Sequence, residues 1–339
     1  MFRLKLRFLF SFLSLLLIGP TATAGATETL VMDNGDRLSG HVLRMSDGVL
    51  EFETGYAGTM KVNWKHVREI LSETNIKLRL AGNEVVSVTS LKQDNGQVCF
   101  ADRSEPVISV MQINPADWET GKASKFGGEV DAAFKLERGN TQVNQTDVTS
   151  RMEWKKTRHR VRVAGELEYG KTDGEVSSDR WSVETSYDNT PSKRFYYGGR
   201  TSLKSDEMSD LNLRWSSGPH IGYRFADTDR TKFSAETGLE YTTEDYHAQS
   251  LDSFIGESWR IEFSHFLIPG KLEVYHRDNG LVSLADLGAL TLDTWTGIKL
   301  PIAGGVHTSA EFKTSYNGKA PAGAKLWDTI YRIKVGYQW

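Results

Sequence analysis

Trp327–Trp339, at the end of the chain, reads W-D-T-I-Y-R-I-K-V-G-Y-Q-W. Apolar, aromatic and Thr residues occupy the odd positions, and mostly polar residues occupy the even ones. Such period-two alternation predicts a β-strand with one apolar and one polar face. The strand runs to the end of the sequence and stops on an aromatic residue, although chain ends usually fray unless they are tied down. This strand is therefore expected to pair with another.

Two kinds of protein could use such a strand. A soluble sandwich could place it at a sheet edge. A membrane β-barrel would pair it with the first strand, because an open edge in lipid leaves backbone polar groups unsatisfied. The strand resembles the closing strand of bacterial outer-membrane barrels, which the barrel assembly machinery recognises as a signal. The residues expected to carry that signal are Tyr331, Ile333, Val335, Tyr337 and Trp339.

The first residues predict export. Residues 1–24 combine a basic start, an apolar run over Phe8–Ile18 and small residues at Ala22–Ala24. These are the parts of a secretory signal peptide, and the apolar run is too short to span a bilayer as a helix. The mature chain is expected to reach the envelope of a Gram-negative bacterium.

Composition narrows the class further. The 339 residues include 11% aromatics, 31 Gly, only 8 Pro and a formal net charge of −3. After residue 24 there is no apolar run of membrane-helix length, so a helical membrane bundle is excluded. A small negative net charge does not indicate a surface that binds nucleic acid. The single Cys99 permits no internal disulfide, and no Cys/His cluster predicts a metal site or a cofactor.

Residues 25–113 predict a separate, small all-β module. Turn signals such as Asp47-Gly48 and Asn95-Gly96 separate short alternating segments, and the segments after these two turns resemble each other. Similar matches elsewhere suggest a duplicated unit of the SH3 or Sm type. The module is expected in the periplasm, where Tyr56, Trp64 or His66 could contact a partner. The alternative, which the size of the side chain favours, is that Trp64 fills the core.

Residues 114–126 read as a linker, and residues 127–339 as an antiparallel transmembrane barrel of about twelve strands, an even number as in bacterial single-chain barrels. Connections are expected to alternate between short turns, such as Lys156–Arg158, and longer loops, such as Gly170–Ser178. Aromatic residues gather at strand ends, as interfacial girdles require. A soluble sandwich requires neither regularity, so the barrel is favoured.

The barrel region resembles a family of outer-membrane proteins catalogued as a domain of unknown function and often labelled salt-induced outer membrane protein. The resemblance rests on four motifs: F-x-L-x-x-G-N-T from Phe134, G-x-x-x-G-Y-R-F-x-D from Gly218, E-x-G-L-x-Y from Glu236, and the terminal Y-x-I-x-V-x-Y-x-W from Tyr331. It implies an outer-membrane barrel with the N-terminal module as an addition. It implies no settled activity.

A barrel of this size lies between filled small barrels and open porins. The residues expected to line its lumen carry both charges, and mixed charges favour cross-strand pairs that brace the interior over a ring that selects ions. A narrow channel for small solutes or ions is one hypothesis, and a structural barrel whose module binds a partner is another. The lumen candidates are Arg160, Arg162, Glu166, Glu184, Arg200, Arg214, Arg224, Glu236, Arg260, Arg332 and Lys334.

An enzyme that modifies lipids is the third hypothesis. His307-x-Ser309 has the spacing of a catalytic pair, but alternation turns both side chains toward the lumen, away from acyl chains. His276 is expected on the lipid-facing side without a partner of that kind. No catalytic residues are therefore predicted. Outer-membrane lipid is the expected surrounding, and the sequence leaves the oligomeric state open.

Overall fold

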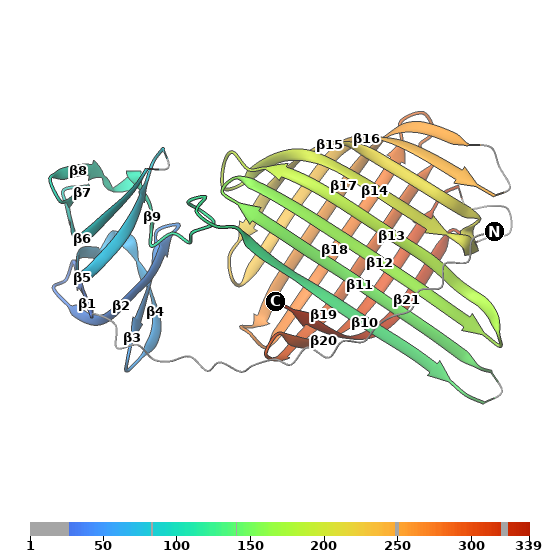
Figure 1. The fold of residues 1–339 in the computed structure, drawn as a ribbon, viewed down its shortest axis with the longest axis horizontal. Helices are drawn as coiled ribbons and strands as arrows, with labels where there is room; N and C mark the ends of the chain where they lie inside the picture. The colour runs from blue at the N-terminus through green and yellow to red at the C-terminus, as the bar shows by residue number, and fades with distance from the viewer. Residues whose placement is uncertain (1–26, 83, 140, 248–250, 320–324) are drawn as a thin grey trace. The chain divides into compact units, whose positions relative to one another are not determined.

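The computed structural model describes residues 27–82, 84–139, 141–247, 251–319 and 325–339. The signal peptide expected at residues 1–24 lies outside them. The chain divides into two compact units, Met1–Pro115 and Ala116–Trp339, and each is described by itself (Figure 1). In the described residues, no helix has the length and apolar character needed to cross a membrane.

The first unit is one sheet of nine strands in the order β4-β3-β2-β1-β5-β6-β7-β8, with β9 pairing both β2 and β5. Because β1 also pairs with β2 and β5, the strands β1, β2, β9 and β5 form a small closed ring. Its elements are β1 Glu28–Met32, β2 Arg37–Ser46, β3 Val49–Thr54, β4 Gly58–Asn63, the 3₁₀ turn η1 Trp64–His66, β5 Val67–Leu80, β6 Val85–Asp94, β7 Gln97–Phe100, β8 Arg103–Pro106, η2 Val107–Ser109 and β9 Val110–Ile113.

This unit repeats one pattern twice. The elements β1 to the start of β5 and the end of β5 to β9 both follow the order of four strands, a 3₁₀ turn and a final strand. The hairpins at Asp47-Gly48 and Asn95-Gly96 both have two consecutive residues with positive φ, which two-residue hairpin turns of the mirror-image type require. The long strand β5 serves both halves. The duplication expected from the sequence is therefore present.

The core of the module lies between these two halves. Trp64 is 4% exposed and packs there, whereas Tyr56 is exposed. The core interpretation of Trp64 is therefore correct. Equivalent positions of the two halves supply other members of the core: Leu30 and Leu78, Leu50 and Val98, Phe52 and Phe100, Val67 and Val110, Ile70 and Ile113.

The second unit is a closed antiparallel barrel in which strands β10 to β21 pair in sequence order (Figure 1). Long alternating segments joined by tight turns lead to this neighbour-to-neighbour order, because antiparallel strands need only short connections. The strands are β10 Lys125–Glu137, β11 Val143–Lys156, β12 His159–Thr172, β13 Glu175–Asn189, β14 Phe195–Asp206, β15 Leu211–Asp227, β16 Thr231–Tyr246, β17 Asp252–Ile268, β18 Leu272–Ser283, β19 Leu290–Ala303, β20 Val306–Asn317 and β21 Trp327–Gln338, with the 3₁₀ turn η3 Glu207–Ser209 before β15.

The two faces of the barrel differ as alternation predicts. Outward positions carry exposed apolar and aromatic side chains, while inward positions carry buried charged ones. A closed sheet satisfies its backbone hydrogen bonds internally, and an apolar outer wall can face the acyl chains of lipid. These are the properties of the transmembrane β-barrels of outer membranes. Neighbouring aromatic rings continue along the wall, as in Tyr223, Phe225, Phe233 and Phe263.

Two boundaries differ from the sequence expectation. The first strand begins at Lys125, inside the expected linker, and the backbone N–H of Thr157 donates to Trp118 at 2.8 Å, so part of that linker folds against the turn between β11 and β12. The loop expected over Gly170–Ser178 is mostly strand. Asp173 and Gly174 both have positive φ, so a two-residue turn suffices and the alternation of polar residues continues on both sides.

The first and last strands close the barrel over a short length. β10 and β21 are in register only from Glu129↔Gln338 to Ala132↔Val335. Two further backbone hydrogen bonds join Gly128 and Trp339 at 3.0 and 3.3 Å. By contrast, β20 and β21 stay in register from Val306↔Tyr337 to Tyr316↔Trp327. The predicted partner of the terminal strand is therefore correct, but the seam between them is incomplete.

Candidate functional site in the charged interior

The lumen candidates of the sequence lie on the inner face of the barrel. Arg224 stacks on the ring of Tyr196, with its guanidinium carbon 4.7 Å from the ring centre. The other candidates all form ion pairs with inward side chains: Arg160, Arg162, Glu166, Glu184, Arg200, Arg214, Glu236, Arg260, Arg332 and Lys334.

Several ion pairs inside the barrel join strands that are not neighbours. Nζ of Lys204 on β14 lies 3.0 Å from Oδ2 of Asp293 on β19, with four strands between them on the shorter way round. Nη2 of Arg260 on β17 lies 2.5 Å from Oε1 of Glu184 on β13. Contacts between such distant strands must pass through the interior. The lumen is therefore crossed by side chains at several levels.

One centre of this network is Glu236 on β16. Its Oε1 accepts a hydrogen bond from Nη2 of Arg162 at 2.6 Å and from the hydroxyl of Tyr196 at 2.9 Å. The guanidinium groups of Arg200 and Arg260 lie 3.8 and 4.0 Å from its other oxygen. A buried carboxylate is tolerated only when cations and donors compensate its lost hydration, and three guanidinium groups do so here.

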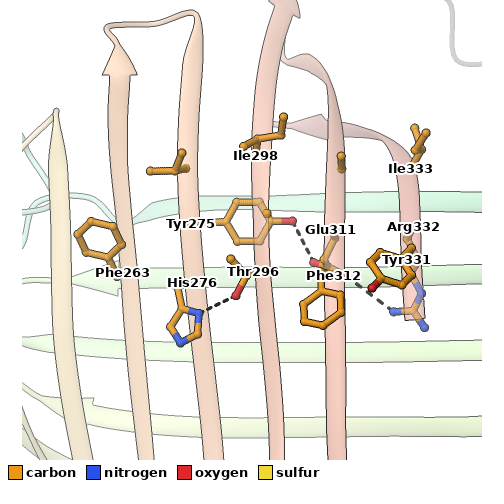
Figure 2. Close-up of a pocket in the computed structure, with 13 residues that line it drawn as sticks. Phe263, Tyr275, His276, Thr296, Ile298, Glu311, Phe312, Tyr331, Arg332 and Ile333 are labelled. Carbon is orange, nitrogen blue, oxygen red and sulfur yellow. Dashed lines mark hydrogen bonds and ion pairs between the residues drawn. The ribbon is translucent and has the colours of Figure 1, made fainter. Parts of the chain in front are cut away.

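A second centre is Glu311 on β20 (Figure 2). Nζ of Lys334 lies 2.5 Å away, Nη2 of Arg277 lies 3.2 Å away, and the hydroxyl of Tyr275 donates at 3.0 Å. Arg332 on β21 pairs with Glu166 at 3.0 Å and with Glu168, both on β12. These contacts connect the last strands of the barrel to β12 past the first two strands.

Glycines on the inner face allow side chains to reach over a strand. Gly336 on β21 lies between His307 and Asp131 in the register, and Nε2 of His307 lies 2.7 Å from Oδ1 of Asp131. A Cβ atom at Gly336 would collide with both of these side chains. The same arrangement recurs where His220 reaches Asp188 at 2.7 Å over the position of Gly198. At Gly336 the missing side chain makes the bridge possible, whereas a Cβ atom at Gly198 would collide with the backbone of Tyr187.

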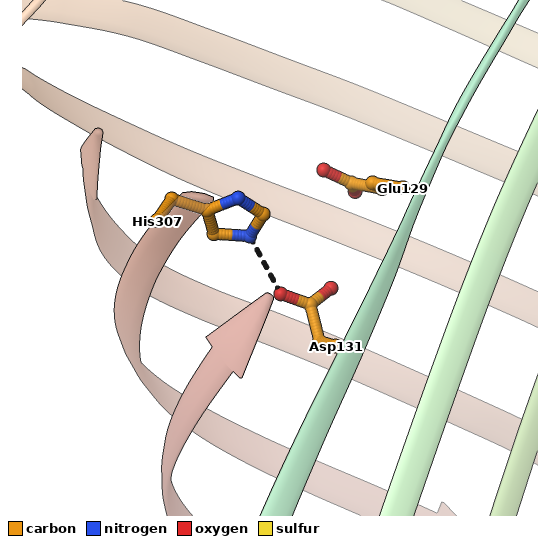
Figure 3. Close-up of side chains that lie close together, drawn as sticks. All are labelled: Glu129, Asp131 and His307. Atoms are coloured by element: carbon orange, nitrogen blue, oxygen red, sulfur yellow. Dashed lines mark hydrogen bonds and ion pairs between the residues drawn. The ribbon is translucent and has the colours of Figure 1, made fainter. Parts of the chain in front are cut away.

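Among the described residues, Glu129, Asp131 and His307 form the one group whose donor atoms all lie within 4.8 Å of one another and could ligate a metal ion (Figure 3). Its carboxylates already have cationic partners. Lys299 lies 2.5 Å from Glu129, and Arg151 contacts it as well. A divalent ion would have to displace these partners, so the donor set fits a braced seam better than a metal centre.

The outer wall carries a depression of about 650 Å³ that runs across strands β17 to β21 (Figure 2). Its lining is mostly apolar, and its polar members include Glu311, Arg332 and a pair in which Nδ1 of His276 lies 2.8 Å from the hydroxyl of Thr296. His276 is thus on the lipid-facing wall. In the described residues it contacts no carboxylate, and His307 and Ser309 lie inside. Glu311 also lines the depression, but its carboxylate is buried and paired with Lys334 and Arg277 inside the barrel, so no acid of the described lining contacts His276 as a hydrolytic triad needs.

The module has its own surface electrostatics. Nδ1 of His66 lies 2.7 Å from Oδ2 of Asp33, and the hydrogen bond from this imidazole lowers the pKa of the Asp33 carboxyl. A hydrogen bond from Arg103 lowers the pKa of Glu84 in the same way. The groove next to Asp33, about 510 Å³, is lined by residues of both halves, including Arg68 and Asp94. This surface is polar and exposed.

Sequence reasoning found most of the inward charges and predicted that they pair, but it did not give which residues pair and it missed some partners. Lys204, Asp293 and Lys313 were not among the candidates, although alternation placed charges on the same faces. Pairing across the lumen depends on the stagger between strands, and a sequence does not give that stagger. The inward glycines Gly198 and Gly336 carried the other missed signal, because a glycine inside a strand marks close approach of other atoms.

No curated protein matches the chain significantly. Among solved structures, a NanC porin shares 10% identity over 63% of this chain and 100% of its own, with a TM-score of 0.41. The translocator domain of the autotransporter NalP from Neisseria meningitidis shares 14% identity over 63% of this chain and 87% of its own, with a TM-score of 0.34. The outer membrane channel DcaP of Acinetobacter baumannii shares 10% identity over 93% of this chain and 94% of its own, with a TM-score of 0.32.

A protein-family model matches residues 130–339, which is nearly the whole barrel and more than half of the chain. The sequence motifs that suggested a family of outer-membrane barrels lie within this match. The chain belongs to the family described as "Protein of unknown function, DUF481".

Proposed function

We propose that this protein is an outer-membrane barrel that passes ions or small polar solutes through a narrow, charge-lined interior. The observation that carries the proposal is the bridge between Lys204 and Asp293, which spans strands far apart on the barrel. A bridge of this kind narrows the lumen without making it apolar. Water and small ions can pass between charged side chains, whereas larger solutes are held back.

The mixture of charges supports weak ion selectivity. Glu236 lies among three guanidinium groups, and Glu311 lies among Lys334 and Arg277. Because each carboxylate is compensated by nearby cations, neither sign dominates the field along the path. A channel of this type is expected to conduct cations and anions at similar rates.

The remaining assignments follow from this proposal. Both ends of the barrel chain lie at the same end of an even-stranded barrel, which in bacterial barrels faces the periplasm. The module is then periplasmic, and the terminal strand with Trp339 is presented to the assembly machinery from that side. We assign no catalytic role, because the polar pair of His276 and Thr296 on the lipid-facing wall lacks an acid.

A second function is favoured by the surface of the module. Tyr56 is 74% exposed and Ile108 is 87% exposed. Ile108 follows Val107, which lines the polar groove near Asp33, and Tyr56 lies in the turn between β3 and β4. Exposed large side chains of this kind are suited to a protein partner. The module would then attach the barrel to another envelope component, and passage of solutes and attachment are compatible.

Liposome swelling tests the passage. Vesicles containing the purified full chain should admit a pentose faster than empty vesicles and should exclude a tetrasaccharide. The variant with Lys204→Ala and Asp293→Ala should admit larger sugars. A matched control changes Arg103→Ala and Glu84→Ala, an exposed pair 2.7 Å apart in the module and outside the barrel. Equal swelling of empty vesicles, the wild type and the bridge variant would refute the channel.

A further inference from the structure

The seam between β10 and β21 is open beyond Ala132 and Val335, on the side away from Trp339. Within the described residues, the register between β10 and β21 ends at Ala132↔Val335. Beyond it, residues 133–137 of β10 pair with β11 alone, and residues 327–334 of β21 pair with β20 alone. Each strand therefore turns one edge of unpaired backbone groups toward the other.

Exposure of the side chains indicates the same opening. Tyr331, Ile333 and Phe134 are 80%, 77% and 75% exposed. Outward aromatic residues on fully paired strands are far less exposed, such as Phe312 at 38%. Lys135 should face the lumen by alternation, yet its side chain is 57% exposed. The excess exposure lies where a neighbouring strand is missing.

An open edge at membrane depth has a chemical consequence. Hydrocarbon cannot hydrogen-bond the free N–H and C=O groups, so polar partners must reach them from the lumen. The geometry points to a lateral opening between β10 and β21, through which a single-chain amphiphile with an anionic head group moves between the lumen and the bilayer. This inference goes beyond the axial passage proposed above and does not depend on it.

The outer groove supplies a place for the hydrocarbon tail. It begins on β17 at Phe263, crosses β19 beside Ile298, and ends on β21 at Tyr331 and Ile333. Figure 2 shows Tyr331 next to Phe312 at that end, with Ile333 farther along β21. Tyr331 and Ile333 belong to the unpaired edge of β21. The apolar surface therefore leads up to the seam.

The inner side of the seam supplies a place for the head group. Arg332 on β21 reaches inward to Glu166 at 3.0 Å and also contacts Glu168. The carboxylate head of a fatty acid offers Arg332 the same bidentate acceptor that these side chains offer. Lys334 is the next inward residue toward the closed part of the seam. Arg332 and Lys334 thus stand behind the opening, paired with carboxylates that an anionic head group would replace, and apolar groups stand in front of it.

Disulfide trapping tests whether the seam is open. In a Cys99→Ser background, Phe134→Cys with Ile333→Cys places thiols where continued register would pair them. Val130→Cys with Tyr337→Cys is the matched control in the paired part. In outer membranes the control should oxidise about tenfold more completely, because thiols on separated strands cannot meet. Equal oxidation of the two pairs would overturn the opening. Disulfides between copies would overturn it in favour of an edge that binds a second chain.

Photolabelling of the wild-type chain tests the ligand and needs no variant to fold. A diazirine-bearing palmitate is added to full-length protein in vesicles of phosphatidylethanolamine and phosphatidylglycerol, and labelled peptides are identified by mass spectrometry. Labels should concentrate severalfold in residues 133–137 and 327–334 relative to β12–β16. Competition by unlabelled palmitate, and not by a neutral alkyl glycoside, is expected for an anionic head group. Even labelling around the wall, or equal competition by both compounds, would refute this ligand class.

Discussion

The ammonium group of Lys204 on β14 lies 3.0 Å from a carboxylate oxygen of Asp293 on β19. Strands β15, β16, β17 and β18 lie between them on the shorter way round the barrel. The hydroxyl of Ser315 also donates to Asp293 at 2.5 Å, which fixes the carboxylate against its own wall. The long side chain of Lys204 therefore spans the lumen between the two strands. Whatever moves through the interior must pass beside this bridge.

Removing the charge of Arg332 should destabilise the barrel. Arg332→Met leaves the carboxylates of Glu166 and Glu168 without one of their main partners in a buried site. The expected loss is about 3–5 kcal/mol of unfolding free energy, the usual effect of breaking a buried ion pair. Urea unfolding in detergent, followed by tryptophan fluorescence, measures it. Lys135→Met, which removes an exposed charge, should change the stability by less than about 0.5 kcal/mol, and equal losses in the two variants would contradict this account.

A side chain at Gly336 should disturb the closed part of the seam. Gly336→Ala places a methyl group against both His307 and Asp131, so the bridge between β20 and β10 must shift. The folded fraction on an unboiled gel is expected to fall. Gly199→Ala is the control, because the nearest atom to its Cβ would be 3.8 Å away. If both variants fold as well as the wild type, Gly336 is not needed for the bridge.

Deleting Trp339 should reduce assembly into the membrane. Its backbone exchanges two hydrogen bonds with Gly128, and its ring lies 6.2 Å from that of Phe126. These contacts lie in the short part of the seam where β10 and β21 are paired. Their loss therefore removes a large share of the contacts that close the barrel. The amount of heat-modifiable protein in outer membranes measures it. Trp327→Ala removes an aromatic residue of the same strand far from the paired part, and it should assemble normally. Normal levels after deletion of Trp339 would speak against this role.

Truncating Trp64 should unfold the module and spare the barrel. Trp64 is buried in the shared core of the two halves, so Trp64→Ala is expected to cost about 3–5 kcal/mol. Limited trypsin digestion of the full chain should then degrade residues of the module while the barrel stays heat-modifiable. Tyr56→Ala, at an exposed position, should resist digestion like the wild type. Loss of the barrel together with the module would show that the two units do not fold independently.

Much of the fold follows from the sequence because side-chain alternation sets which face each residue occupies. The pattern of Trp327–Trp339 was enough to predict a strand with Tyr331 outside and Arg332 inside, and the barrel has this arrangement. Turn chemistry likewise identified Asp47-Gly48 and Asn95-Gly96 as equivalent hairpins of the module. These are local properties, and local properties can be read from a single chain.

The site could be predicted only in part because its geometry is not local. The inward position of Glu236 follows from alternation, and Arg260 lies opposite it on the neighbouring β17, but Arg162 and Arg200 come from β12 and β14, whose stagger against β16 is set by closure of the whole barrel. The incomplete register of β10 and β21 is likewise a result of closure. No pattern within either strand distinguishes the paired Val335 from the unpaired Ile333.

The single-channel current of the full chain in a planar bilayer tests directly whether the bridge between Lys204 and Asp293 controls a passage. The wild type should give small, weakly selective steps. Replacing both partners of the bridge, Lys204→Ala with Asp293→Ala, should enlarge the steps, and the exchanged pair Lys204→Asp with Asp293→Lys should return them toward the wild-type size. No current from any of the three proteins, or identical currents from all of them, would contradict a passage controlled by this bridge.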